Sequence, residues 1–218
     1  MDAARRSAAA HVGRPAASGR KADTLDRLRR DAADCRACPL WKNATQTVFG
    51  EGSPRSSVML VGEQPGDRED LEGRPFVGPA GSILDRALAD AGIDRIQLYV
   101  TNAVKHFKNE PRGKRRIHKK PSEREIEACE QWLTREIDIV SPKLIVALGA
   151  TAARALTGRA TAIERNRGTL IDLAPPTKLL VTVHPSALLR MPPRYKEEAY
   201  RRFVTDLKRI APFLKGAK

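Results

Sequence analysis

The sequence predicts an α/β/α sandwich, in which a central sheet of four parallel strands lies between two layers of helices. Four short apolar segments, each bounded by turn-forming residues, have the composition of buried parallel strands. We expect these strands at 57–62, 97–101, 143–149 and 178–183. Helical patterns alternate with them, at 81–91, 122–139, 150–156 and about 196–214. This alternation favours right-handed crossovers and a sheet covered on both faces.

The residue that follows each expected strand indicates where a site would lie. Glu63 follows the first strand, Asn102 the second and His184 the fourth, whereas the third runs into the alanine-rich helix 150–156. Ligands of open α/β sheets bind beyond the carboxyl ends of the strands. A carboxylate at the mouth of a buried strand is also costly without a use. We therefore expect the site in this crevice.

The ends of the chain differ in composition from its middle. The first 22 residues are rich in Ala, Arg, Ser and Gly, which predicts a disordered basic tail, and a transit peptide is the alternative. The remaining residues, 23–218, are enough for one domain with a substantial core. No apolar run is long enough to cross a bilayer, so we expect a cytoplasmic protein that is monomeric and has no membrane partner.

The charge of the chain favours a polyanionic partner. Its formal net charge is +14, which indicates nucleic acid ahead of an anionic membrane surface. Much of this excess lies between Val104 and Lys120, where Glu110 is the one acidic residue. The basic residues of this stretch are Lys105, Lys108, Arg112, Lys114, Arg115, Arg116, Lys119 and Lys120. A solvated basic loop or a localisation signal is the plainer interpretation.

The three cysteines cannot all be paired in disulfides. Cys35 and Cys38 form a C-x-x-C pair, and Cys129 stands alone in a helical pattern. This usage fits a reducing compartment and a metal or cluster better than it fits secretion.

Several motifs, taken in order, resemble those of a known family. The segments GEQPGDRED, PFVGPAG, TNAVKHF and VHPSALL are similar to the motifs of the family-four type of uracil-DNA glycosylase. The segment GKRRIH resembles more narrowly the UdgX subgroup, whose members bind uracil-containing DNA and become covalently attached to it. The resemblance extends from about Cys35 to the final helix.

The resemblance implies a role for each residue of the pocket. Phe76 would stack on the flipped uracil, and Asn102 would read its edge. A main-chain amide near Gln64 or Gly66 would add a donor. His184 would stabilise the negative charge on the departing base, and Glu63 the positive charge on the sugar.

The resemblance also implies a 4Fe–4S cluster held by Cys35, Cys38, Cys129 and His106. The wider family has a cysteine where this chain has His106, and the UdgX subgroup agrees with the histidine. Histidine can replace cysteine on cluster iron. A Cys₃His zinc site is one alternative, and His106 as an ordinary surface residue is another. Because glycosidic cleavage transfers no electrons, we expect a structural cluster.

His118 decides the outcome of the implied reaction. Its imidazole would attack C1′ of the sugar and trap the enzyme on DNA, as in the UdgX subgroup. The alternative is a turnover glycosylase that activates water. Contacts to the DNA backbone would come from Lys114, Arg115, Arg116, Ser186 and Arg190, with single-stranded DNA preferred or tolerated. A rival from another class is a non-catalytic binder of single-stranded nucleic acid.

Overall fold

The sheet contains the four strands that the sequence predicts and a fifth that it does not. The computed structural model describes residues 24–214, and the tail expected at 1–22 lies outside the described residues. The strands of the sheet are β1 (Val58–Gly62), β2 (Leu98–Asn102), β5 (Leu144–Leu148), β7 (Thr177–Thr182) and β6 (Leu170–Ala174). Their order is β2-β1-β5-β7-β6. The first four are parallel, and β6 pairs antiparallel with β7. The expected four-stranded parallel sheet is therefore corrected by one antiparallel edge strand.

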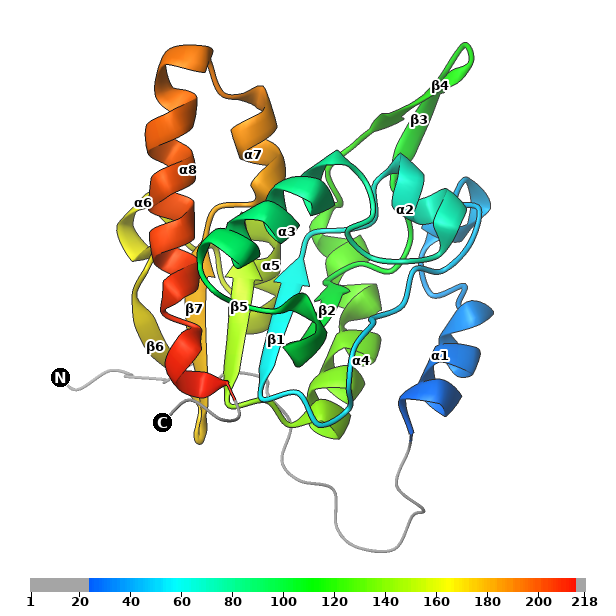
Figure 1. Cartoon of the computed structure of the whole chain (residues 1–218). Helices are drawn as coiled ribbons and strands as arrows, with labels where there is room; N and C mark the ends of the chain where they lie inside the picture. The colour runs from blue at the N-terminus through cyan, green and yellow to red at the C-terminus, as the bar shows by residue number, and fades with distance from the viewer. Residues whose placement is uncertain (1–23, 215–218) are drawn as a thin grey trace, which may run out of the picture.

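Helices cover both faces of the sheet, as predicted (Figure 1). Side chains alternate along each strand, so that Met59 and Val61 join one core and Val58 and Leu60 the other. The helices with residues in the first core are α1 (Leu25–Ala33), α4 (Glu123–Val140) and α5 (Ala150–Thr157). Those with residues in the second are α3 (Pro79–Asp90), α7 (Pro185–Arg190) and α8 (Pro193–Lys208). There are also two short α-helices, α2 (Asp67–Glu72) and α6 (Ile163–Asn166), and short 3-10 helices at Pro39–Lys42, Arg95–Gln97 and Ala211–Phe213.

Residues 109–118 of the basic stretch form a hairpin and not the loop that the composition suggests. Strands β3 (Asn109–Arg112) and β4 (Arg115–His118) pair antiparallel, with Asn109 opposite His118. Gly113 at the turn has a φ of +60°, which favours glycine. The hairpin projects beyond the end of the sheet (Figure 1). It carries His118 on its last residue.

The order of the strands places a topological switch point between β1 and β5. The chain passes from β1 to β2 on one side, and then crosses to β5 and β7 on the other. In such sheets the crevice beyond the two diverging strands is the usual ligand site. Among the described helices, none is both long and apolar enough to span a membrane.

Candidate active site

The carboxylate of Glu63 lies at the switch point. Glu63 directly follows β1, and Thr151 lies in the first turn of α5, just beyond β5. The Thr151 hydroxyl donates a hydrogen bond of 2.5 Å to Glu63 Oε2. The other oxygen, Oε1, lies 3.6 Å from Nε2 of His118. Loops after both diverging strands therefore meet at one carboxylate, which is partly exposed to solvent.

Asn102, Phe76 and Gly62 form a narrow slot beside this carboxylate. A Cβ atom on Gly62 would lie 2.3 Å from Asn102 Oδ1 and 2.5 Å from Phe76 Cζ, so the slot depends on glycine here. Asn102 is 2% exposed, and its Oδ1 has no hydrogen-bond partner among the described residues. An unpaired buried acceptor of this kind costs about 1–3 kcal/mol. Asn102 Oδ1 is therefore positioned to accept a hydrogen bond from an N–H group of a ligand.

Phe76 is held in a backbone conformation that a non-glycine residue rarely adopts. Its φ is +56°. The Arg95 guanidinium donates to the carbonyls of Pro75, at 2.9 Å, and Phe76, at 3.2 Å, which fixes the turn. The ring lies 5.9 Å from that of His184, centroid to centroid. Strain of this kind, held by surrounding contacts, is typical of residues that position a ligand.

The contacts of His184 fix its tautomer. The main-chain N–H of Ser186 donates to His184 Nδ1 at 3.2 Å, so this nitrogen is an acceptor and the neutral ring carries its proton on Nε2. The Ser186 hydroxyl lies 2.8 Å from the same nitrogen. Burial lowers the pKa of His184 to about 4, and the charges of Arg190 and His118 act in the same direction. At neutral pH the ring is an uncharged hydrogen-bond donor.

His118 is likewise neutral, and Gln64 holds it. The Gln64 carbonyl oxygen accepts from the main-chain N–H of Lys108 at 3.0 Å. Its amide nitrogen therefore donates to the carbonyl of Lys119, at 2.8 Å, and to Nε2 of His118, at 2.9 Å. Nε2 must then carry a lone pair. Burial lowers the pKa of His118, with Glu63 opposing and Arg190 adding to the shift, so the contact with Glu63 is no ion pair at neutral pH.

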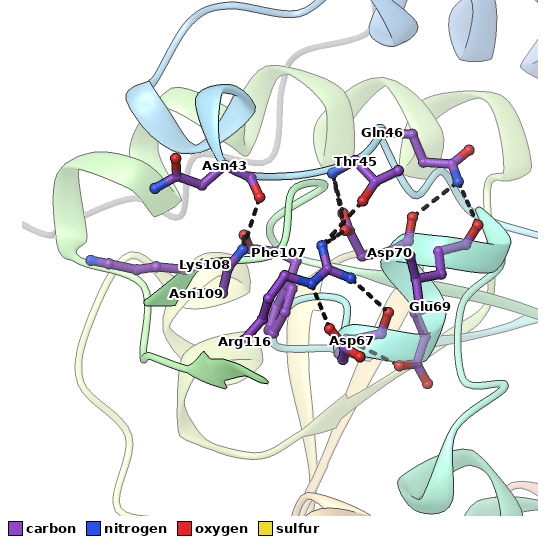
Figure 2. A network of polar contacts seen from close by, with 12 residues as sticks. Asn43, Thr45, Gln46, Asp67, Glu69, Asp70, Phe107, Lys108, Asn109 and Arg116 are labelled. Carbon is purple, nitrogen blue, oxygen red and sulfur yellow. Dashed lines mark hydrogen bonds and ion pairs between the residues drawn. The ribbon is translucent and has the colours of Figure 1, made fainter. Parts of the chain in front are cut away.

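Arg116 anchors the hairpin to the body of the protein. Its Nε donates to Asp67 at 2.7 Å, and its Nη1 to the fully buried Asp70 at 2.5 Å and to Thr45 Oγ1 at 3.1 Å. Figure 2 shows this guanidinium enclosed by the two carboxylates, above Phe107. The sequence assigned Arg116 to the DNA backbone. In the structure its donors are occupied within the protein.

Four other cations of the basic stretch have no ion pair in the part of the chain that the structure describes. Lys105 pairs with Glu136, Lys108 with Glu125 and Lys119 with Glu110. The unpaired cations are Arg112, Lys114, Arg115 and Lys120. Arg190, at the end of α7, lies close enough to His118 and His184 to lower the pKa of both.

Of the two main-chain amides from which a donor to the base is expected, one is already occupied. The N–H of Gly66 donates to Glu69 Oε2 at 3.1 Å, and that of Gly78 to Glu69 Oε1 at 2.8 Å. Glu69 thus ties the turn after β1 to the turn after Phe76. The main-chain N–H of Gln64 makes no hydrogen bond within residues 24–214. Gln64 therefore offers the free donor.

The three cysteines are free thiols in one neighbourhood. The Sγ of Cys35 accepts from the indole N–H of Trp132 at 3.1 Å, and that of Cys129 from the main-chain N–H of Lys105 at 3.2 Å. Burial raises the pKa of Cys129 to about 12, and the other two thiols add to the shift. His106 lines a hollow together with Cys35. The donors fit a cluster in kind. However, across residues 24–214 no three or more His, Cys, Asp or Glu side chains are grouped as a ready metal site.

The structure brings together most of the residues that the sequence predicts for the pocket. Glu63, His118 and His184 interact electrostatically, and Asn102 and Phe76 meet at Gly62. Sequence reasoning missed Thr151, Glu69 and the side-chain role of Gln64. The spacing of Glu69, three residues after Gly66 at the start of α2, resembles a capping pattern and could have indicated its contact. The hydroxyl of Thr151 has no such signal.

Comparison with known proteins gives consistent matches over most of the chain. Residues 49–208 match the model of the uracil DNA glycosylase superfamily. A type-4 uracil-DNA glycosylase of Thermotoga maritima is 40% identical over 182 residues, covering 83% of this chain and 90% of that protein. Those of Sulfurisphaera tokodaii and Archaeoglobus fulgidus are 36% and 33% identical. They cover 78% and 86% of this chain, and 78% and 92% of their own lengths.

Proposed function

The chain belongs to the uracil DNA glycosylase superfamily, and on this basis we propose that it excises uracil from DNA. The buried Asn102 Oδ1 carries the proposal, because it lacks a donor among the described residues. Uracil has a ring N–H between two carbonyl groups. That N–H would satisfy Oδ1, while the Asn102 amide nitrogen donates to one of the carbonyls.

The rest of the slot fits a flat pyrimidine. Phe76 supplies an aromatic face, and stacking of a base on such a face contributes about 1–3 kcal/mol. The free main-chain N–H of Gln64 supplies a second donor for a carbonyl oxygen. We assign base recognition to Phe76, Asn102, Gln64 and His184. Gly66 shapes the turn, since its amide is bound to Glu69.

Two opposite charges develop when the glycosidic bond breaks, and a different side chain would stabilise each of them. The electron pair of the bond leaves with uracil, and the neutral His184 can donate its Nε2 proton in a hydrogen bond to the resulting anion. The sugar is left with oxocarbenium character, which the Glu63 carboxylate stabilises. Both groups act from the ends of strands of one sheet.

We further propose that His118 captures the sugar. Its neutral Nε2 carries the lone pair that a nucleophile needs. Attack would exchange the Gln64 hydrogen bond for a covalent bond to C1′, and the imidazolium so formed would lose its Nδ1 proton to solvent. The product is an N-glycosyl histidine. Release of the DNA from His118 would then require a water molecule to reach C1′ at a position that the hairpin occupies.

The exposed cations of the hairpin are suited to the DNA backbone. We assign phosphate contacts to Lys114 and Arg115, which have no acidic partner within residues 24–214, and to Arg190 beside the pocket. Arg116 and Ser186 serve instead as supports for the hairpin and for His184. Single-stranded DNA is the expected preferred substrate, because no duplex has to be opened.

We propose Cys35, Cys38, Cys129 and His106 as the ligands of a 4Fe–4S cluster. Three neighbouring thiols, two of which accept N–H donors, and a buried imidazole support this set. When bound, the cluster would tie the end of α1 to α4 and to the turn after β2. It would supply structure, and we assign it no part in bond cleavage.

A denaturing gel with a uracil-containing oligonucleotide tests both steps of the proposed reaction. We expect release of free uracil together with a protein–DNA band that survives denaturation. His118→Ala should lose the band and retain uracil release, and a thymine oligonucleotide should give neither. Uracil release without a band in the unmodified protein would leave a turnover glycosylase. Absence of uracil release would refute glycosylase activity and favour a nucleic-acid binder.

A further inference from the structure

We propose that Thr151 is a positioning residue for this reaction, because its hydroxyl fixes one oxygen of the Glu63 carboxylate. The inference rests on the proposed function. Thr151 follows β5, the one parallel strand end to which the sequence gives no role. It is 3% exposed and donates to Glu63 Oε2 at 2.5 Å. A hydroxyl at this depth has no solvent with which to exchange that bond.

The hydrogen bond leaves a single Glu63 oxygen free for the sugar. With Oε2 held by Thr151, Oε1 faces His118 Nε2 at 3.6 Å. An unheld carboxylate at a partly exposed position would sample several rotamers. Threonine is suited to the task because its branched Cβ restricts the hydroxyl to few directions in a helix. Thr151 therefore sets the direction from which negative charge reaches C1′.

The same turn also limits the position of His184. Gly149, two residues before Thr151, has a φ of +91°, and a Cβ atom there would lie 3.0 Å from His184 Cβ. Its N–H donates to the carbonyl of Thr182 at 2.9 Å, which fixes the turn against β7. The turn 149–151 thus contacts the group that stabilises the sugar and the group that stabilises the base.

The closing experiment compares Thr151→Val, Thr151→Ala, Thr151→Ser and Thr157→Val. Valine keeps the shape of threonine and removes the hydroxyl, while serine keeps the hydroxyl. Thr157 lies at the other end of α5 and donates to the carbonyl of Ala153, so its valine variant is the matched control. The readouts are the single-turnover rate of uracil release at saturating DNA, the affinity for uracil-containing DNA, and Tm.

We expect Thr151→Val to lower the rate of release by about 10- to 100-fold, the range for loss of a hydrogen bond to a charged group. DNA affinity should stay within about twofold, and Thr151→Ser should recover most of the rate. Thr157→Val should release uracil at the rate of the unmodified protein. A normal rate in Thr151→Val, or no recovery in Thr151→Ser, overturns the proposal.

Two further outcomes separate this inference from the proposed function. If Thr151→Val and Thr151→Ala both fail to fold, the hydroxyl has a structural role and positioning is refuted. A structure of Thr151→Val in which Glu63 keeps its place also refutes it, whatever the activity. If the unmodified protein releases no uracil, the proposed function fails first, and the position of Glu63 in that structure still decides whether Thr151 holds it.

Discussion

Two histidines of the site are neutral, and their neighbours give them opposite tautomers. Ser186 donates to Nδ1 of His184, which leaves the proton on Nε2. Gln64 donates to Nε2 of His118, which leaves that atom a lone pair. One ring can donate to an anion and the other can attack an electron-poor carbon. The different roles of the two histidines therefore follow from one hydrogen bond to each ring.

Covalent capture should persist at mildly acidic pH. The pKa of His118 is lowered from 6.5 by burial, and Arg190 adds to this while Glu63 opposes it. The imidazole is the nucleophile only when neutral, so capture is lost as pH falls through a value below 6.5. We expect the ratio of adduct to released uracil to stay constant down to about pH 6.5 and then to fall.

Arg190→Gln provides the control for this pH dependence. Because Arg190 lowers the pKa of His118, its removal should move the decline toward higher pH. Taking the ratio of adduct to uracil separates capture from any loss of excision. A decline centred above pH 6.5 in the unmodified protein would contradict the neutral state assigned to His118.

Gly62→Ala should close the base slot. The added Cβ would lie 2.3 Å from Asn102 Oδ1 and 2.5 Å from Phe76 Cζ, and both must move. A displacement of about 1 Å at a reacting site can cost on the order of 10²-fold in rate. We expect a loss of that size in single-turnover uracil release. At Gly92 a Cβ meets nothing within 4 Å, but the φ of +74° strains any other residue, so Gly92→Ala should lower Tm and still retain the rate. Equal rates for both variants would place uracil elsewhere.

The sequence predicted individual site residues where strand ends identified them. Glu63, Asn102 and His184 each lie at or just beyond the carboxyl end of a strand, and one edge of a parallel sheet brings such residues together. The roles of Thr151 and of the Gln64 side chain depend on side-chain directions across elements that are distant in sequence. Local pattern carries no information on those directions.

At the scale of the element, the hairpin β3–β4 is held by anchors more than by a core. Most of its side chains are exposed. Its connections to the body include the Arg116 contacts with Asp67 and Asp70 and the hydrogen bond from the Asn109 amide to the carbonyl of Asn43 (Figure 2). The Gln64 side chain adds contacts at its base. Its few apolar residues explain why the sequence suggested a loop. Strand β6 escaped prediction for a different reason: its short apolar run is interrupted by Asp172, and it is a half-exposed edge strand.

Arg116→Ala should weaken capture more than excision. Without the guanidinium the hairpin loses its ion pair with the buried Asp70, and His118 loses a fixed position. Truncation of one partner of a buried charge pair commonly costs about 2–5 kcal/mol. We expect adduct formation to slow by roughly tenfold or more, with uracil release retained by the sheet residues. Time courses of both products, measured in one reaction, test this.

Arg115→Ala is the matched control, because Arg115 precedes Arg116 in β4 and has no ion pair within the described chain. It should weaken DNA binding and flatten its salt dependence by about 0.7 in the log–log slope on single strands. At saturating DNA its ratio of adduct to uracil should be that of the unmodified protein. If Arg115→Ala and Arg116→Ala behave alike, the anchoring role is wrong.

At the scale of the whole molecule, the candidate active-site residues and the cysteines occupy two separate places. The active-site residues lie at the switch point of the sheet. Thr151 and Glu63 meet beyond the carboxyl ends of the paired strands β1 and β5. The thiols lie among α1, the start of the helix at Pro39–Lys42, and α4. Sequence alone predicted the sandwich because apolar runs of strand length alternate with helical patterns. It could not predict the antiparallel edge, which those runs do not reveal.

The purified protein should be brown and contain iron and acid-labile sulfide if the cluster proposal is correct. His106→Cys should keep the visible absorption, since thiolate is the commoner cluster ligand, and His106→Ala should lower it together with Tm. Absorption spectra, metal analysis and thermal unfolding of the same samples provide the test. A colourless protein with one zinc per chain would establish the Cys₃His zinc alternative instead.

The attachment of the hairpin through a few side chains has a consequence for how such proteins diversify. Residues at the ends of the sheet strands cleave the glycosidic bond. The residue that captures the product lies on a short hairpin that side-chain contacts attach to the sheet domain. Capture and excision can therefore change independently, because a sequence change in the hairpin leaves the excision residues of the sheet in place. Transplanting residues 109–118, together with carboxylate acceptors for Arg116, should therefore convert a turnover glycosylase into one that remains covalently bound to its DNA product.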